Sequence, residues 1–134
     1  MKRVVIDASA LAEYLLRSSR GLEIERALVD REHDLHAPSL CDIELMAVLR
    51  RGLLEGRLSG ERAVEAIDDL RDLPITRHGH QNLLEQILVL RQNFSAYDAA
   101  YVALADRLDA ALLTDDRWLH RAVSENSEVR LLGI

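Results

Sequence analysis

Short apolar runs alternate along the chain with longer stretches in which apolar residues recur at helical spacing. The runs that predict strands cover residues 4–6, 35–37, 74–76, 111–114 and 129–132. Apolar residues three and four positions apart predict helices over about residues 8–18, 21–32, 39–55, 59–72, 79–92, 96–108 and from 116 onward. Strands that alternate with helices favour a parallel sheet with both faces covered. The pattern therefore predicts an α/β fold with a short, mostly parallel central sheet flanked by helices on both faces.

The phase of the apolar positions also predicts which side of a helix faces the core. In the helix over residues 21–32, the inward residues are expected to be Leu22, Ala27 and Leu28. In the helix over residues 39–55, they are expected to be Leu40, Ile43, Ala47 and Val48.

Acidic residues directly follow two of the predicted strands. Asp7 ends the run over residues 4–6, and Asp115 and Asp116 follow the apolar part of the run over residues 111–114. Each aspartate can be a simple N-cap of the next helix. The carboxyl ends of parallel strands, however, meet at one edge of the sheet, where the sites of α/β proteins gather. We therefore expect Asp7 and the Asp115–Asp116 pair to face the same edge.

Glu44 lies in the helix predicted over residues 39–55, and most of its neighbours at helical spacing are apolar. These neighbours are Leu40, Ala47, Val48 and Arg51. A buried carboxylate is costly unless it is protonated, paired or bound to a metal ion. A salt bridge to Arg51 and a metal-binding role both remain open. Asp42, in contrast, completes a capping box with Ser39 and is expected to cap the helix.

Asp98 has a similar setting in the helix predicted over residues 96–108. Its neighbours at helical spacing are Phe94, Tyr101, Val102 and Ala105. Ser95 and Asp98 also match a capping box, and an acid in the first turn is favoured by the helix dipole. A surface cap would not need such apolar neighbours. Two acids that face the core and two at strand ends can converge only around a positive charge.

Oxygen ligands alone favour a hard cation, Mg²⁺ or Mn²⁺, over zinc. No histidine or cysteine spacing competes strongly with the acids as a metal site. His78 and His80 are expected to lie in a surface loop, and His33, His36 and His120 are assigned no role. The single cysteine cannot form an internal disulfide, which is compatible with a reducing cytoplasm.

The length of 134 residues predicts one domain over residues 1–134. The longest apolar run, residues 99–105, is far shorter than the roughly 18 residues that span a bilayer, so we expect no membrane contact and a cytoplasmic location. The net charge of −6 argues against a nucleic-acid partner. All but one of the 17 basic residues are arginine, however, which binds phosphate in a bidentate manner. Composition alone leaves the partner open.

Four segments resemble, in the same order, the acidic motifs of PIN-domain nucleases: VVIDASAL, DIELMAVLRR, FSAYDAAYVALA and LLTDDRWL. The third is especially similar to that of the small bacterial VapC-type toxins, and the resemblance covers nearly the whole chain. It implies a PIN-like fold, with catalytic and metal-ligand roles for Asp7, Glu44, Asp98 and Asp116. Ser9 and Thr114 match hydroxyl positions that support the acidic cluster. Asp115 falls in a variable position, where it either assists the cluster or only caps a helix.

The resemblance implies a Mg²⁺-dependent endoribonuclease, with Mn²⁺ as a substitute ion. Water would attack an RNA phosphodiester and leave a 5′-phosphate and a 3′-hydroxyl. The protein would be the toxin of a VapBC-like toxin–antitoxin pair, blocked by a VapB-like antitoxin and assembled as a homodimer. Apolar residues of the segments 22–28 and 45–54 are expected to supply the partner surfaces.

The contacts to the substrate are not defined by any motif. The candidates for phosphate contact are Arg17, Arg20, Arg50, Arg51 and Arg117. Trp118 can stack on a base, but we expect it to pack in the core.

Two other functions are compatible with parts of the pattern. A haloacid-dehalogenase-like phosphatase would use Asp7 as its nucleophile. Ala8 and Ser9 follow Asp7, however, so the second aspartate of such enzymes is missing. A catalytically inactive PIN-fold module would bind RNA or protein without cleavage, and would keep its effect when Asp98 is replaced by asparagine.

Overall fold

The computed structural model describes residues 2–29 and 32–133, and within them four strands form one fully parallel sheet. The strands are β1 (Lys2–Ile6), β2 (His33–Pro38), β3 (Ile75–His78) and β4 (Ala111–Leu113), in the order β3-β2-β1-β4. The predicted short parallel sheet is confirmed. Residues 129–132 add only an isolated parallel bridge between Leu131 and Leu112, so the expected final strand is reduced to a single paired residue.

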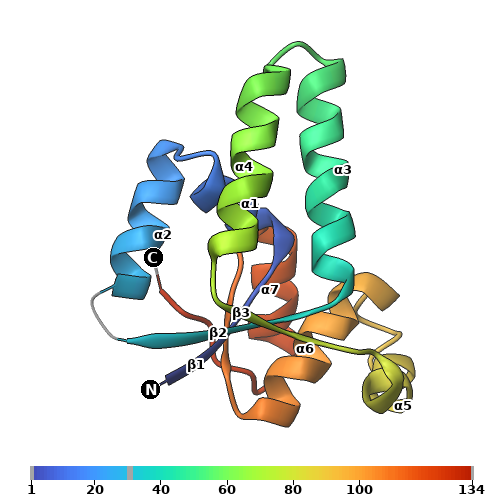
Figure 1. The fold of residues 1–134 in the computed structure, drawn as a ribbon. Coiled ribbons are helices and arrows are strands. Elements are labelled where there is room, and N and C mark those ends of the chain that lie inside the picture. The colour runs from blue at the N-terminus through green and yellow to red at the C-terminus, as the bar shows by residue number, and fades with distance from the viewer. Residues whose placement is uncertain (1, 30–31, 134) are drawn as a thin grey trace.

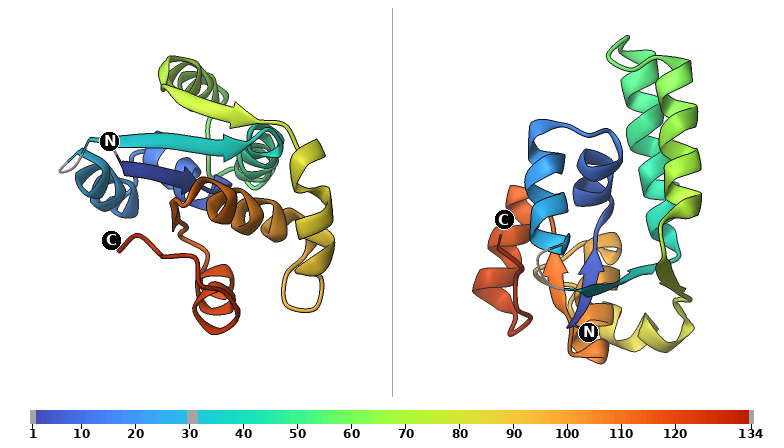
Figure 2. Two further views of the ribbon diagram at one scale, coloured as in Figure 1. Left: turned by 90° about the horizontal axis from the view of Figure 1, so that it is seen from below. Right: turned by 60° about the vertical axis from the view of Figure 1, so that its left-hand side comes forward.

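Helices cover both faces of this sheet, as predicted. They are α1 (Ala8–Leu15), α2 (Ser19–Val29), α3 (Leu40–Leu54), α4 (Gly60–Asp72), α5 (Leu84–Val89), α6 (Ala96–Leu108) and α7 (Arg117–Asn126). Figure 1 shows α1, α3 and α4 above the sheet and α5 and α6 below it. The long helices α3 and α4 form an antiparallel hairpin that projects beyond the rest of the molecule (Figures 1 and 2).

Three predicted helices differ in extent from the structure. The helix expected over residues 8–18 ends at Leu15. The helix expected over residues 79–92 is split into a 3-10 turn, Gln81–Leu83, and the short α5. The helix expected over residues 21–32 begins earlier, at Ser19, and its expected end includes residues outside the described part of the chain. Gly21 does not break this helix. A Cβ at Gly21 would lie 2.0 Å from the carbonyl oxygen of Glu13, so glycine permits α2 to pack closely on α1.

The inward faces of α2 and α3 were predicted only in part: Leu28, Leu40 and Val48 do pack against the core, but they are partly buried and do not form its centre. In α2 the buried residues include Ile24, whereas Leu22 is 48% exposed. In α3 the buried residues are Cys41, Leu45, Leu49 and Gly52, whereas Ile43 is 72% exposed. Both possible stripes of α3 are apolar, so the packing against α1 and α4 decides the phase, and helical spacing alone does not.

The helix caps are confirmed except at the start of α3. Ser59 and Ser95 cap α4 and α6 by accepting hydrogen bonds from the backbone N–H groups of Arg62 and Asp98, both at 3.1 Å. Ser39 instead has a helical φ of −57° and forms no side-chain cap. The Asp42 carboxylate lies against the Arg77 guanidinium, at 2.8 and 2.9 Å. A charged partner on β3 therefore replaces the expected capping box.

The pairing of β1 with β4 brings two distant segments together at the carboxyl edge of the sheet. Ile6 is in register with Leu113, and the backbone N–H of Asp7 donates to the carbonyl oxygen of Leu113 at 3.1 Å. Asp7 and Thr114 therefore lie side by side, although 107 positions separate them in sequence. In the described part of the chain, no helix is long and apolar enough to cross a membrane.

Candidate active site

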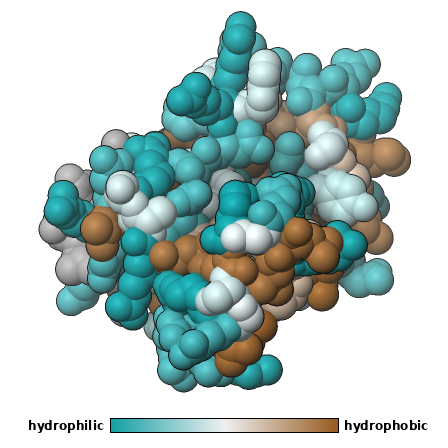
Figure 3. Space-filling view, turned by 90° about the horizontal axis from the view of Figure 1, so that it is seen from above, coloured by the Kyte–Doolittle hydropathy of each residue, from teal (hydrophilic) through white to brown (hydrophobic). Residues whose placement is uncertain are grey.

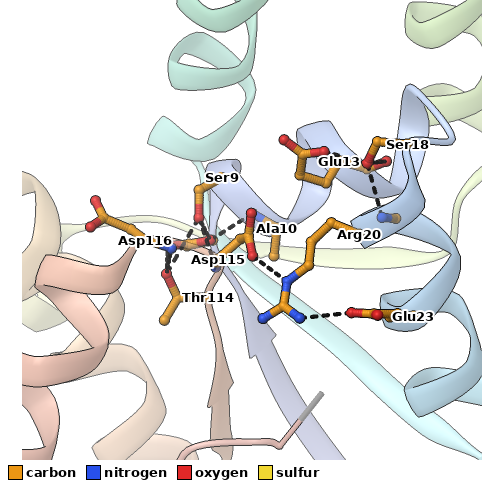
Figure 4. A network of polar contacts seen from close by, with 11 residues as sticks. Ser9, Ala10, Glu13, Ser18, Arg20, Glu23, Thr114, Asp115 and Asp116 are labelled. Carbon is orange, nitrogen blue, oxygen red and sulfur yellow. Dashed lines mark hydrogen bonds and ion pairs between the residues drawn. The ribbon is translucent and has the colours of Figure 1, made fainter.

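Asp7 is the buried centre of a polar network at this edge of the sheet. Figure 4 labels its partners Ser9, Ala10 and Thr114. Its Oδ1 accepts hydrogen bonds from the Ser9 hydroxyl at 2.7 Å and from the Ala10 backbone N–H at 3.0 Å. Its Oδ2 accepts a hydrogen bond from the Thr114 hydroxyl at 2.5 Å. Asp7 is thus the N-cap of α1, which was the simplest prediction for it. Its side chain is also fixed against the end of β4.

The two hydroxyl groups that donate to Asp7 also hold the loop after β4. Ser9 Oγ accepts a hydrogen bond from the backbone N–H of Asp115 at 3.0 Å. Thr114 Oγ1 accepts one from the backbone N–H of Asp116 at 3.0 Å. Ser9 and Thr114 therefore act as polar bridges between Asp7 and the two following aspartates.

Asp115 and Asp116 point in different directions (Figure 4). Asp116 caps α7, with its Oδ1 accepting from the backbone N–H groups of Trp118 at 2.8 Å and Leu119 at 3.2 Å. Asp115 instead forms an ion pair with Arg20 on α2, with 2.6 Å between Oδ1 and Nε. The adjacent acids thus have separate partners, which their sequence did not reveal.

Glu44 and Asp98 come from α3 and α6, and both are partly buried. Glu44 Oε1 accepts a hydrogen bond from the Tyr101 hydroxyl at 2.6 Å. The alternative salt bridge between Glu44 and Arg51 is not formed within the described residues. Tyr101 is buried on α6, the helix that also carries Asp98. This helix therefore provides Asp98 and, through Tyr101, the hydrogen bond that holds Glu44.

Burial raises the pKa values of three of these carboxyl groups. Desolvation raises the pKa of Asp7 to about 6, against the hydrogen bonds from Thr114, Ala10 and Ser9, and the Asp116 charge adds to the rise. Desolvation also raises the pKa of Asp98, with a further contribution from Asp116.

The pKa of Glu44 is raised by desolvation and by Asp98, against the hydrogen bond from Tyr101. Successive acids of the set therefore repel one another, from Glu44 through Asp98 and Asp116 to Asp7. The structure brings all four predicted acids within electrostatic reach of their neighbours.

These four acids differ from nearby carboxylates in having no basic partner. Among the described residues, Asp42 pairs with Arg77 and Asp115 pairs with Arg20. No ion pair in the same part of the chain includes Asp7, Glu44, Asp98 or Asp116. Clustered carboxylates without a counter-charge are unfavourable, and a bound cation would offset this cost.

The donor chemistry fits a hard divalent cation, because every candidate ligand atom is a carboxylate oxygen. As the side chains stand in residues 2–29 and 32–133, no three acidic, histidine or cysteine side chains are gathered closely enough to hold a metal ion. One oxygen each of Glu44 and Asp116 is directed to a protein donor instead. The remaining oxygen of each carboxylate receives no hydrogen bond within the described structure.

Two predictions about other side chains were wrong. Trp118 is 80% exposed, so it does not pack in the core. His78 is the last residue of β3, and its Nε2 lies 2.9 Å from Nδ1 of the buried His36. His36 also contacts Asp34, with 2.8 Å between Nε2 and Oδ2. These contacts stabilise the β2–β3 side of the sheet and are separate from the four acids.

Comparisons of the sequence with known proteins identify one family. The family model described as PIN domain matches residues 4–124. VapC ribonuclease Mb0985 of Mycobacterium bovis is 41% identical over 113 residues, which are 84% of this chain and 85% of that protein. Ribonuclease VapC1 of Mycobacterium tuberculosis is 38% identical over 133 residues, which are 98% of this chain and 99% of that protein.

Solved structures with little sequence identity share the same fold. PAE2754 from Pyrobaculum aerophilum has a TM-score of 0.72 at 21% identity, over 97% of this chain and 83% of that chain. VapC20 of Mycobacterium tuberculosis, described as a Sarcin-Ricin loop cleaving toxin, has a TM-score of 0.67 at 16% identity, over 89% of this chain and 94% of that chain. At such identities the likeness concerns the fold alone.

Proposed function

Because the chain belongs to the PIN-domain family and is a VapC-type member of it, we propose that it is a metal-dependent endoribonuclease. The observation that carries the proposal is the set Asp7, Glu44, Asp98 and Asp116. These acids come from four separate segments, repel one another and lack basic partners within the described residues. Relatives with 41% and 38% identity are named ribonucleases, which supports the choice of RNA as substrate.

In this proposal the four acids hold Mg²⁺, for which Mn²⁺ can substitute. When bound, the ion would activate water and offset the charge that develops on the phosphate. The protein's own part is to keep the carboxylates in place. Ser9 and Thr114 fix both oxygens of Asp7, and Tyr101 orients Glu44. The product ends would be a 5′-phosphate and a 3′-hydroxyl.

We further propose that the protein acts in the cytoplasm as the toxin of a VapBC-like toxin–antitoxin pair. The names of the relatives, VapC ribonuclease and Ribonuclease VapC1, support this role. A VapB-like antitoxin and a second copy of the chain need apolar surface. Leu22 on α2 and Leu53 and Leu54 on α3 are exposed and available for such contacts. Figure 3 shows apolar surface among hydrophilic side chains on the face seen from above.

The decisive experiment compares RNA ends after brief induction of the wild-type protein, Asp98→Asn and Asp42→Asn. Asp42 is a matched control, because it is an acid of the same sheet edge that already has a basic partner. New 5′-phosphate ends are expected with the wild type and Asp42→Asn, and not with Asp98→Asn. Equal toxicity of Asp98→Asn and wild type would favour a non-catalytic binding module.

The phosphatase alternative is less compatible with this site. Ala8 and Ser9 follow Asp7, so the site lacks the second aspartate that such phosphatases use. Trapping of a phosphoenzyme on Asp7 would nevertheless establish that alternative.

A further inference from the structure

A cleft of about 630 Å³ opens beside Asp116 and continues the candidate active site along the loop after β4. Its lining residues come from α2, from that loop and from α7: Arg20, Thr114, Asp115, Asp116, Arg117 and His120. Asp116 belongs to both the cleft and the acidic set, and Thr114 lines the cleft while its hydroxyl donates to Asp7. Whatever occupies the cleft therefore lies next to the four acids.

Arg20 reaches this cleft from α2 and is held there by two carboxylates (Figure 4). Its Nε donates to Asp115 Oδ1 at 2.6 Å, and its Nη1 donates to Glu23 Oε2 at 2.7 Å. These hydrogen bonds raise the pKa of Arg20, first through Asp115 and then through Glu23. Its third nitrogen, Nη2, has no acceptor within the described residues and points away from Glu23, toward the side of Thr114 (Figure 4). The guanidinium thus offers one oriented, unused donor group to the cleft.

The Asp115 side chain forms an ion pair with a basic residue, whereas that of Asp116 does not within the described residues. Asp115 Oδ1 binds Arg20, and the backbone N–H of Asp115 donates to Ser9. Its side chain is therefore engaged with α2, whereas Asp116 belongs to the set of acids without basic partners. This explains why two adjacent aspartates follow β4.

A ribonuclease that binds its substrate over four carboxylates needs basic groups for the neighbouring phosphates. Arg117 begins α7 next to Asp116 and forms no ion pair within the described residues, so its charge is available. Arg20 and Arg117 reach the cleft from different helices and line it together. Planar guanidinium groups bind phosphate oxygens in a bidentate manner, which suits a strand that must be positioned rather than only attracted.

We propose that this cleft binds a backbone phosphate of single-stranded RNA adjacent to the scissile one, with Arg20 and Arg117 as its contacts and Asp115 as the residue that positions Arg20. The inference rests on the proposed ribonuclease function. It adds to that function the place where the strand lies and a role for Asp115 outside the metal site.

The test measures binding of a short, fluorescently labelled single-stranded RNA of random sequence by anisotropy, at about 50 to 200 mM salt. The protein carries Asp7→Asn, so the RNA stays uncleaved. Arg20→Ala and Arg117→Ala are each expected to weaken binding about tenfold. The double variant Arg20→Ala/Arg117→Ala should also reduce the slope of log affinity against log salt by about 0.7, which corresponds to the loss of one phosphate contact on a single strand.

The variant Asp115→Asn distinguishes two roles of Asp115: positioning of Arg20, and simple repulsion of the RNA phosphates by its negative charge. Removal of a negative charge from the cleft would by itself strengthen RNA binding. If Asp115 positions Arg20, the variant weakens binding instead, and adding Asp115→Asn to Arg20→Ala produces no further loss. In the cleaving protein, Arg20→Ala should raise KM for RNA while kcat stays within about twofold.

Arg57→Ala is the matched control, because Arg57 also forms an exposed ion pair, with Glu55, between α3 and α4. It should leave both affinity and salt slope unchanged. Thermal unfolding of each variant shows whether the fold is retained. Unchanged RNA binding by Arg20→Ala, or stronger RNA binding by Asp115→Asn, overturns the inference. An Arg20→Ala variant that loses binding of the antitoxin but keeps binding of RNA overturns it as well. Failure of the proposed function itself would appear differently, as an absence of metal-dependent RNA cleavage by the wild type.

Discussion

Replacement of Asp7 by asparagine should stabilise the metal-free protein while it removes the activity. Asp7 is only 5% exposed, and desolvation raises its pKa from 3.8 to about 6. At about 1.4 kcal/mol per pKa unit, the ionised side chain reduces the free energy of unfolding at pH 7 by about 3 kcal/mol. Asparagine has nearly the same shape and no charge. The Thr114 hydroxyl would lose its carboxylate acceptor, at a cost of about 1 kcal/mol, so we expect a net gain of about 2 kcal/mol.

The pH dependence of this gain follows from the direction of the shift. A carboxyl group with a raised pKa in the folded state binds more protons when folded than when unfolded, so its contribution to stability falls as pH rises. The penalty is complete above about pH 6 and absent below the unfolded pKa of 3.8. The stability difference between Asp7→Asn and wild type should therefore be largest at neutral pH and shrink steadily toward pH 4.

The assay is urea unfolding of both proteins across this pH range, with EDTA and then with excess Mg²⁺. Magnesium should raise the free energy of unfolding of the wild type more than that of Asp7→Asn, because only the wild type keeps the full acidic set. Asp42→Asn serves as the control: it keeps all four acids, so magnesium should raise its free energy of unfolding as much as that of the wild type. An Asp7→Asn variant less stable than the wild type in EDTA at pH 7 would show that the buried Asp7 charge does not destabilise the metal-free protein.

Three further predictions concern residues around the site and the packing below it. Tyr101→Phe removes the hydroxyl that holds Glu44 at 2.6 Å, so kcat for RNA cleavage should fall about tenfold while far-ultraviolet circular dichroism is unchanged. Thr114→Val removes the donor to Asp7 and the acceptor for the Asp116 N–H, and urea unfolding should show a loss of about 1 to 3 kcal/mol. Gly21→Ala places a Cβ against the backbone of Glu13, and the midpoint of thermal unfolding should fall by an amount equivalent to about 1 to 3 kcal/mol. Normal activity of Tyr101→Phe would show that its contact with Glu44 is not needed for cleavage. Unchanged stability of Thr114→Val or Gly21→Ala would contradict the role given to the contact that each variant changes.

Local sequence signals were enough to predict the parallel sheet and the edge at which its acids gather. Asp7 and Thr114 each follow a short apolar run, and parallel pairing brings such ends together. Glu44 and Asp98 were identified because their helical neighbours are mostly apolar. Their burial and raised pKa values agree with that argument.

Signals that depend on distant partners could not be read from the sequence. Cys41 and Ile43 lie on competing apolar stripes of α3, and packing against other helices selects the first. From the sequence, Asp42 can either complete a capping box or form an ion pair. Only the position of Arg77 on β3 decides between these two roles. The exposure of Trp118 is a different case: Leu119 and Val123 form the buried stripe of α7, Trp118 lies outside it, and the helical phase was enough to predict this.

The central claim is that Asp7, Glu44, Asp98 and Asp116 together bind a divalent cation. Anomalous diffraction from crystals of the wild-type protein grown with manganese tests this claim most directly. We expect an anomalous peak among these four carboxylates, and its loss in Asp98→Asn crystals. Well-ordered wild-type crystals with manganese bound elsewhere and none at these acids would contradict it.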